Sequence, residues 1–185
     1  IAHGIGMVHQ HFMLVDNFTV TQNIVLGSEV CGAASILDMK KAREKVCQII
    51  EQYGLEVDPD AKIEDISVGM QQRVEILKAL YRGADILILD EPLSGVDIEG
   101  EHQLLEMLDE LRTEYDLSIL LSTHDFATLG QFADKVILLN KRVLRMGPPE
   151  EVTASPEFYE TFHLRMGKGA RADGALVCTG GSAAL

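Results

Sequence analysis

One short stretch limits the folds open to this chain of 185 residues. Residues Ile86 to Leu89 form a continuous apolar run, and Asp90, Glu91 and Pro92 follow it directly. Such a run, ended by a turn signal, predicts a strand buried on both faces, as in parallel sheets. Open α/β sheets bind ligands at the carboxyl ends of their strands, where paired carboxylates suit a metal ion beside a general base. The alternative is a strand followed by a solvated acidic turn.

A second predicted strand ends in the same way. Residues 118–121 are an apolar run with His124 just beyond it, and a helical pattern over Glu99–Tyr115 precedes them. Strand, helix and strand in this order give a parallel sheet. We therefore expect Asp90, Glu91 and His124 at one edge of the sheet. A lone histidine after a strand is more often structural, but the neighbouring acids favour a functional role.

A helix is predicted to begin at Ser67, which is placed to cap it, and to end at Gly83. Its apolar stripe faces a core. The first amides of a helix have no partner within it, and the helix dipole is positive at this end. The N-terminus at Ser67 is thus a candidate phosphate site.

The other expected elements follow from periodicity, caps and turn residues. They are a strand over 5–8, a capping box at Thr19–Gln22 that opens a helix to Leu26, a helix over 38–54, a hairpin of 135–140 with 142–146 that Gly147-Pro148-Pro149 breaks, a short helix over 156–164, and a flexible tail.

Composition excludes some classes of function. The net charge is −13, which argues against a non-specific nucleic-acid binder, since such proteins need a basic surface. Cys31, Cys47 and Cys178 have no C-x-x-C spacing, so neither a disulfide framework nor a zinc site is indicated, and a reducing, cytoplasmic setting is the simplest inference. No apolar run approaches the roughly 18 residues of a membrane span, so work at a membrane needs a partner.

Three histidines near the beginning of the chain raise the possibility of a metal site. They are His3, His9 and His11. No cysteine or carboxylate lies at ligand spacing beside them, which favours ordinary surface or packed histidines. Gln10, between two of them, is compatible with a simple surface turn.

Five segments in order resemble the ABC-type ATPase domain. They are Gln10 within residues 8–12, Ile66–Leu80, Ile86–Pro92, Ser94–Asp97 and Ser122–Asp125. The resemblance implies an α/β fold: a partial P-loop NTPase (ABC-type) domain with a parallel sheet core and a helical subdomain. The domain spans residues 1–163, with residues 11–66 and the helix to 83 as the helical subdomain, and residues 164–185 form the tail.

The resemblance also implies roles for residues at the expected sheet edge. Asp90 would hold Mg²⁺, and Glu91 would polarise the attacking water. His124 would contact the γ-phosphate of ATP. Gln10 would join the metal shell and report the nucleotide state to a membrane partner. The physical basis is charge stabilisation of phosphoryl transfer by a metal and fixed amides, with one base orienting water.

A second set of implied roles involves the opposing chain of a head-to-tail dimer. Ser67 and Gly69 would bind the γ-phosphate of ATP held by that chain, and Asp97 would couple the two sites. The family pattern at the helix start is Leu-Ser-Gly-Gly-Gln, whereas this chain has Ile66-Ser67-Val68-Gly69-Met70. Val68 and Met70 are therefore departures from the pattern.

The implied function is the ATP-hydrolysing motor of an ABC-type importer, with ATP and Mg²⁺ as cofactors. The implied partners are a second ATPase subunit, transmembrane permease subunits and an extracytoplasmic solute-binding protein, with no nucleic acid. The implied location is the cytoplasmic face of the cell membrane. Residues 1–92 resemble nucleoside and simple-sugar importer ATPases, and the rest resembles metal-ion importer ATPases.

Two alternatives to a transport motor stay open. One is a non-transport ABC protein of translation or DNA maintenance, which predicts long coiled-coil heptads or basic arms that this sequence lacks. The other is a catalytically incompetent assembly module that lends its signature helix, which begins at Ser67, to an active partner.

The second alternative, the assembly module, arises because the 185 residues contain no phosphate loop (Walker A) of the form G-x-x-x-x-G-K-[ST]. The Gly167-Lys168 pair has Phe162 where the first glycine should be. We expect the sequence to begin after this loop.

The 185-residue chain alone is predicted to bind Mg-ATP weakly and to be inactive as an ATPase. The reason is that the amides and lysine of a phosphate loop supply most of the contacts that bind the β- and γ-phosphates. Titration calorimetry checks this, and a micromolar dissociation constant for Mg-ATP would contradict it.

Overall fold

The computed structural model describes residues 4–31, 37–126 and 129–163. They form two compact units that divide between His124 and Asp125. The predicted tail over 164–185, His3 and Cys178 lie outside the described residues.

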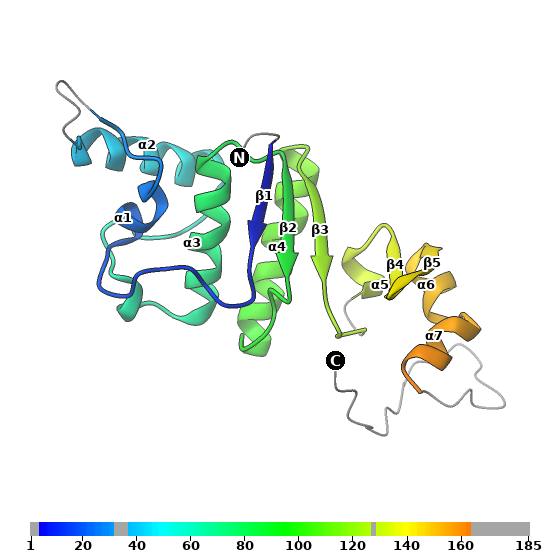
Figure 1. Cartoon of the computed structure of the whole chain (residues 1–185). Helices are drawn as coiled ribbons and strands as arrows, with labels where there is room; N and C mark the ends of the chain where they lie inside the picture. The colour runs from blue at the N-terminus through cyan, green and yellow to red at the C-terminus, as the bar shows by residue number, and fades with distance from the viewer. Residues whose placement is uncertain (1–3, 32–36, 127–128, 164–185) are drawn as a thin grey trace. The chain divides into compact units, whose positions relative to one another are not determined.

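A three-stranded parallel sheet forms one layer of the first unit, with the helices packed beside it (Figure 1). Its strands, in spatial order, are β1 (Ile5–Val8), β2 (Ile86–Asp90) and β3 (Ser118–Ser122). Helix α4 (Ile98–Glu114) makes the crossover from β2 to β3. The prediction of a parallel sheet built from strand, helix and strand is confirmed.

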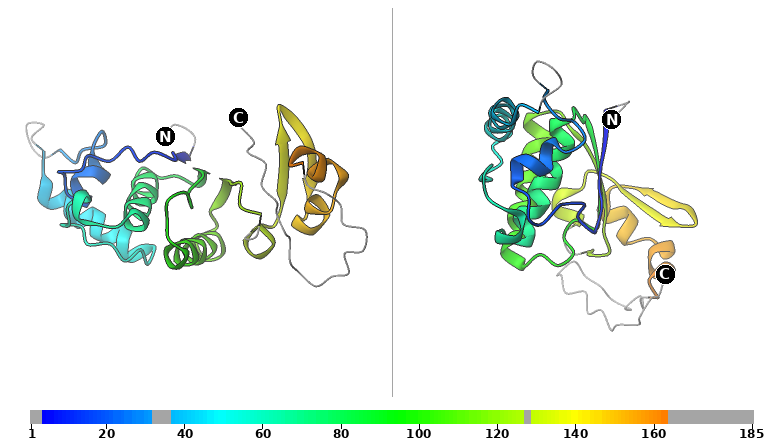
Figure 2. Two further views of the ribbon diagram at one scale, coloured as in Figure 1. Left: turned by 90° about the horizontal axis from the view of Figure 1, so that it is seen from below. Right: turned by 60° about the vertical axis from the view of Figure 1, so that its left-hand side comes forward.

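Helices α3 (Val68–Tyr81) and α4 cover one face of this sheet (Figure 2). Leu87 and Leu89 point to that face and are fully buried. On the opposite face Ile86 is 38% and Leu120 is 53% exposed. The expectation that both strands are buried on two faces is therefore wrong for the described residues, because these place helices on one face.

Two more helices pack against α3. They are α1 (Val20–Val25) and α2 (Met39–Gln52), and a short 3₁₀ turn, η2 (Ile63–Asp65), leads into α3. The predicted capping box at the start of α1 is confirmed: Thr19 and Gln22 exchange hydrogen bonds between side chain and backbone. Buried apolar side chains from α1 to α4, β1 and β2 form one continuous core.

Exposed polar contacts hold α2 to the segment before η2. Arg43 donates to both carboxylate oxygens of Asp60, with the shortest contact at 2.6 Å. This hydrogen bonding by the guanidinium lowers the pKa of Asp60 below its usual value. The pair is solvent-exposed, so it positions the segment more than it stabilises the fold.

The second unit is a hairpin with short helices. Its elements are α5 (Leu129–Phe132), β4 (Val136–Asn140), β5 (Arg142–Gly147), α6 (Pro149–Thr153) and α7 (Pro156–Thr161). The antiparallel hairpin is confirmed, and it turns at Lys141, whose φ is 57°. The predicted break at Gly147 ends β5, but Pro149 also begins α6, which the sequence analysis missed. Proline is well suited to a first helical position.

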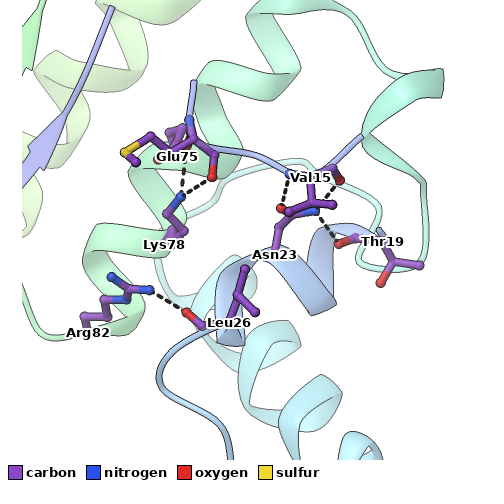
Figure 3. Close-up of polar contacts among 8 residues, drawn as sticks. Val15, Thr19, Asn23, Leu26, Glu75, Lys78 and Arg82 are labelled. Atoms are coloured by element: carbon purple, nitrogen blue, oxygen red, sulfur yellow. Dashed lines mark hydrogen bonds and ion pairs between the residues drawn. The ribbon is translucent and has the colours of Figure 1, made fainter. Parts of the chain in front are cut away.

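The side chain of Asn23 organises the chain that leads into α1 (Figure 3). Asn23 is 1% exposed. Its Oδ1 accepts the N–H of Val15 at 2.7 Å, and its Nδ2 donates to the carbonyls of Val15 and Thr19 at 3.1 Å. One buried amide therefore satisfies both peptide groups of Val15.

Replacing Asn23 with Ala is predicted to lower the free energy of unfolding by about 2 to 4 kcal/mol, because buried peptide groups lose their partners. Urea denaturation measures the loss. Asn17→Ala is the matched control, since Asn17 is exposed in the same segment, and its effect should stay within about 0.5 kcal/mol. Equal losses for the two variants would contradict the role given to Asn23.

Candidate active site

The C-terminal ends of β2 and β3 bring two carboxylates next to a serine. Asp90 pairs with Ser122 in the parallel register. The Ser122 hydroxyl donates to Asp90 Oδ1 at 2.7 Å, and it accepts the N–H of Glu91 at 3.1 Å. The Glu91 N–H also lies 3.2 Å from the Ser122 carbonyl. Ser122 therefore fixes both acidic residues relative to the sheet.

Glu91 leaves the strand in an unusual backbone conformation. Its φ is 45°, in the left-handed region that side chains other than glycine rarely adopt. Such conformations cost of order 1–3 kcal/mol and cluster at functional sites. The turn directs the Glu91 carboxylate toward His124, whose Nδ1 lies 2.8 Å from Glu91 Oε2.

His124 is the exposed member of this group. Its side chain is 82% exposed, against 26% for that of Glu91. Because the carboxylate can only accept, Nδ1 carries the proton in this contact and Nε2 is left to face solvent. The structure thus places Asp90, Glu91 and His124 together, while their chemical roles stay predictions.

Gln10 lies at the same edge of the sheet by register. Val8, the last residue of β1, pairs with Leu89, so the chain beyond Val8 emerges beside Asp90. The Gln10 side chain is exposed and makes no hydrogen bond with any described residue. The register brings Gln10 to this edge, and its side chain has no fixed contact there.

A groove of about 400 Å³ lies between the N-termini of α3 and α4. Ser67, Gly69 and Asp97 line it, together with Val96 and Arg73. Ser67 caps α3, as predicted, and accepts the Met70 N–H at 3.3 Å. Within the described parts of the chain, the N–H groups of Val68 and Gly69 have no acceptor. Two helix amides therefore remain for an anion.

The α4 side of the groove is built around Asp97. Its carboxylate accepts the Gly100 N–H at 3.0 Å and so caps α4. Across the groove, Arg73 of α3 donates to Gln103 of α4 at 3.2 Å. A Cβ added at Gly69 would meet Val96 at 3.8 Å, an ordinary contact. The glycine is thus not required by packing within the described residues, and it leaves room above the free amides.

The predicted site residues therefore fall into two groups. Asp90, Glu91 and His124 are hydrogen-bonded directly or through Ser122, and Gln10 follows the adjacent strand. Ser67, Gly69 and Asp97 line the groove, whose lining includes none of the first group. The predicted site residues thus lie in two separate clusters on one chain, which we call half-sites.

The donor atoms fit a magnesium nucleotide. Asp90 Oδ1 is bound to Ser122, while Oδ2 has no partner among the residues described, so one hard oxygen is available to a cation. No group of three or more His, Cys, Asp or Glu that could hold a metal occurs in the described ranges. The free Asp90 oxygen fits Mg²⁺, which proteins bind through one or two carboxylates plus substrate phosphates.

Sequence reasoning missed two residues of these half-sites, Ser122 and Arg73. A polar residue that ends an apolar strand, in register with an acid on the next strand, was the available signal for Ser122. Arg73 is a helical residue whose role depends on the position of α4. Neither the periodicity nor the spacing of residues in the sequence predicts where α4 lies.

Comparison with known proteins identifies the family. A family model described as ABC transporter matches residues 1–94, about half of the chain. The chain belongs to the ABC transporter family. The ATPases of this family bind ATP, and the relatives below are named for that property.

Several curated relatives are import ATP-binding proteins. A nucleoside import ATP-binding protein of Lactococcus lactis is 52% identical and a guanosine import ATP-binding protein of Bacillus subtilis is 50% identical, each over 138 residues. Each match covers 75% of this chain and 27% of the relative. A zinc import ATP-binding protein of Acinetobacter baylyi is 37% identical over 69% of this chain and 49% of its own length.

Solved structures show the same fold. CbiO1 of Clostridium perfringens, part of an ABC transporter complex, is 29% identical with a TM-score of 0.67, over 88% of this chain and 64% of that one. The cassette MJ0796, solved as a dimer bound to ADP and Pi, is 26% identical with a TM-score of 0.61, over 78% of this chain and 62% of that one. The α/β fold of an ABC-type P-loop ATPase cassette is thereby confirmed.

None of the helices in residues 4–31, 37–126 and 129–163 combines the length and hydrophobicity that a membrane span requires.

Ser122→Ala is predicted to lower the free energy of unfolding by about 1 kcal/mol relative to Ser118→Ala. The substitution removes the hydroxyl that bonds Asp90 and Glu91, whereas Ser118 is an exposed serine on the same strand. Chemical denaturation of both variants measures the difference. Indistinguishable unfolding curves would show that Ser122 does not hold the two acids.

Proposed function

We propose that this chain is part of the ATP-hydrolysing motor of an ABC-type importer. It supplies the catalytic residues at the edge of the sheet and the signature helix, which begins at Ser67. In this proposal residues 1–163 belong to one ABC-type domain. The residues from 11 to 66, with α3 to residue 83, form its helical subdomain. The observation that carries the proposal is the pair of separate half-sites on one chain. A head-to-tail dimer joins half-sites of this kind into complete ones.

The first half-site supplies groups for water activation. Glu91 is the general base: its carboxylate accepts the proton of a water that attacks the γ-phosphate. The contact with His124 Nδ1 fixes the orientation of the base, and His124 Nε2 is free to reach a phosphate oxygen. Bound Mg²⁺ would neutralise phosphate charge, and Asp90 would hold it. Gln10 would complete the metal shell.

The second half-site binds the γ-phosphate of the nucleotide held by the opposing chain. The free amides of Val68 and Gly69 and the Ser67 hydroxyl supply hydrogen-bond donors, and the positive end of the α3 dipole favours the anion. Asp97, fixed at the start of α4, couples the two sites across the dimer interface. The cassette solved as a dimer with ADP and Pi supports this arrangement.

Nucleosides are the substrate class that the relatives favour. Identity is 52% and 50% to the proteins named for nucleoside and guanosine import, and 37% to the one named for zinc import. A metal-ion importer is the second candidate, supported by the zinc relative. The partners in either case are a second ATPase subunit, permease subunits and an extracytoplasmic solute-binding protein, with the ATPase at the cytoplasmic face of the membrane. Transport of labelled guanosine or zinc by the assembled complex separates the two.

When this chain is assayed with a phosphate loop ahead of it, Glu91→Gln is predicted to lower turnover by roughly 10²- to 10⁴-fold, because a positioned base is lost. ATP binding should persist, since Asp90 and the helix amides are unchanged. The variant should also accumulate as an ATP-bound dimer, measured by size-exclusion chromatography with Mg-ATP.

Asp90→Asn is the matched variant, because it alters the adjacent carboxylate. It should weaken Mg²⁺-dependent nucleotide binding itself, which the Glu91 variant retains. Parent-level turnover of Glu91→Gln, or its failure to form a dimer with Mg-ATP, would exclude Glu91 as the base.

A further inference from the structure

The segment that follows Gln10 is held to α3 by a pair of charged side chains. Glu75 Oε1 accepts the Met13 N–H at 2.8 Å, and Lys78 Nζ donates to the Met13 carbonyl at 3.1 Å. Lys78 also donates to Glu75 Oε1 at 2.9 Å (Figure 3). Both backbone polar groups of Met13 are thus bound by side chains one turn apart on α3.

This ion pair differs from the other pairs of the unit in its burial. The side chains of Glu75 and Lys78 are 6% and 16% exposed, whereas those of Asp109 and Arg112 on α4 are 44% and 37% exposed. Removing two charges from water is costly, and a buried pair is weak evidence for stability alone. Unlike Asp109 and Arg112, Glu75 and Lys78 also form hydrogen bonds with the backbone of Met13.

The position of Met13 limits how far Gln10 can move. Val8 is fixed in the sheet, and Met13 is fixed on α3, so residues 9–12 are the free span between two anchors. Gln10 is three residues from Met13, which limits its distance from that anchor to about 11 Å. The next anchor along the chain is Val15, which Asn23 holds by two hydrogen bonds. Without the Met13 contacts this limit becomes about 18 Å.

We propose that Glu75 and Lys78 are positioning residues for Gln10. By binding the Met13 peptide they shorten the free span from residues 9–14 to residues 9–12, and so hold Gln10 at the edge of the sheet beside Asp90. The same contacts tie this span to α3, the helix that Ser67 caps. The importance of this position for nucleotide sensing rests on the proposed function of Gln10, but the positioning itself is testable without nucleotide.

The test measures the spread of positions of residue 11 in the 185-residue chain. Spin labels are attached at His11→Cys and Glu51→Cys, both exposed sites, after replacement of Cys31, Cys47 and Cys178 by Ser. Labelling at His11 leaves Gln10 intact, and Glu51 on α2 gives a reference in the same unit, away from the residues that the variants change. Pulsed electron–electron double resonance then yields the distribution of distances between the labels.

The informative variant is the double substitution Glu75→Leu with Lys78→Met. Replacing both partners leaves no unpaired buried charge, so the melting temperature should stay close to that of the parent. The distance distribution should nevertheless broaden by roughly 2–3 Å, the increase in root-mean-square length from four to six free residues. Glu75→Gln keeps an acceptor for the Met13 N–H and should keep the parent distribution.

A charge-matched control removes the exposed pair on α4 by Asp109→Ala with Arg112→Met. This control should leave the distribution of the His11 label unchanged. An unchanged distribution in the Glu75 and Lys78 double variant, with parental stability, would overturn the proposal. So would equal broadening in the control. Since no nucleotide is present, failure of the proposed ATPase function would show in the Glu91 and Asp90 variants and leave this measurement intact.

Discussion

Parallel pairing of β2 with β1 and β3 is the constraint on which the candidate site depends. Strands that run in the same direction end at the same edge, so the residues that follow them meet without any specific attraction between their side chains. The polar contacts then refine this arrangement: Ser122 bonds Asp90 and Glu91, and His124 bonds Glu91. The backbone of Glu91 adopts an unfavourable, positive φ in this arrangement.

The sequence carried most of the fold because its local signals agree with one another. The cap at Ser67, the capping box at Thr19 and the apolar run of β2 each predict an element that the structure contains. The same signals could not predict how far β2 and β3 are buried. An apolar run shows that a strand can be buried, but it does not show that another element covers it. Short α6 was missed because Pro149 was interpreted as a breaker and not as a first helical residue.

The prediction of site residues from the sequence had a similar limit. Residues at the ends of predicted elements could be placed, because topology alone decides where Asp90, Glu91 and His124 lie. Residues that act from the middle of a helix could not be placed. Glu75 and Lys78 appear in the sequence as an ordinary pair on a helix, and only the path of the segment from Gln10 to Val15 shows what they hold.

The open face of the sheet has a consequence for the chain in solution. Ile5, Met7, Ile86 and Leu120 present an apolar surface that the helices of the first unit leave uncovered. Contact between two such surfaces would release water, while the net charge of −13 makes two copies of the chain repel each other. Salt screens that repulsion and leaves the apolar attraction in place. Added salt is therefore expected to favour association of the chain through this face.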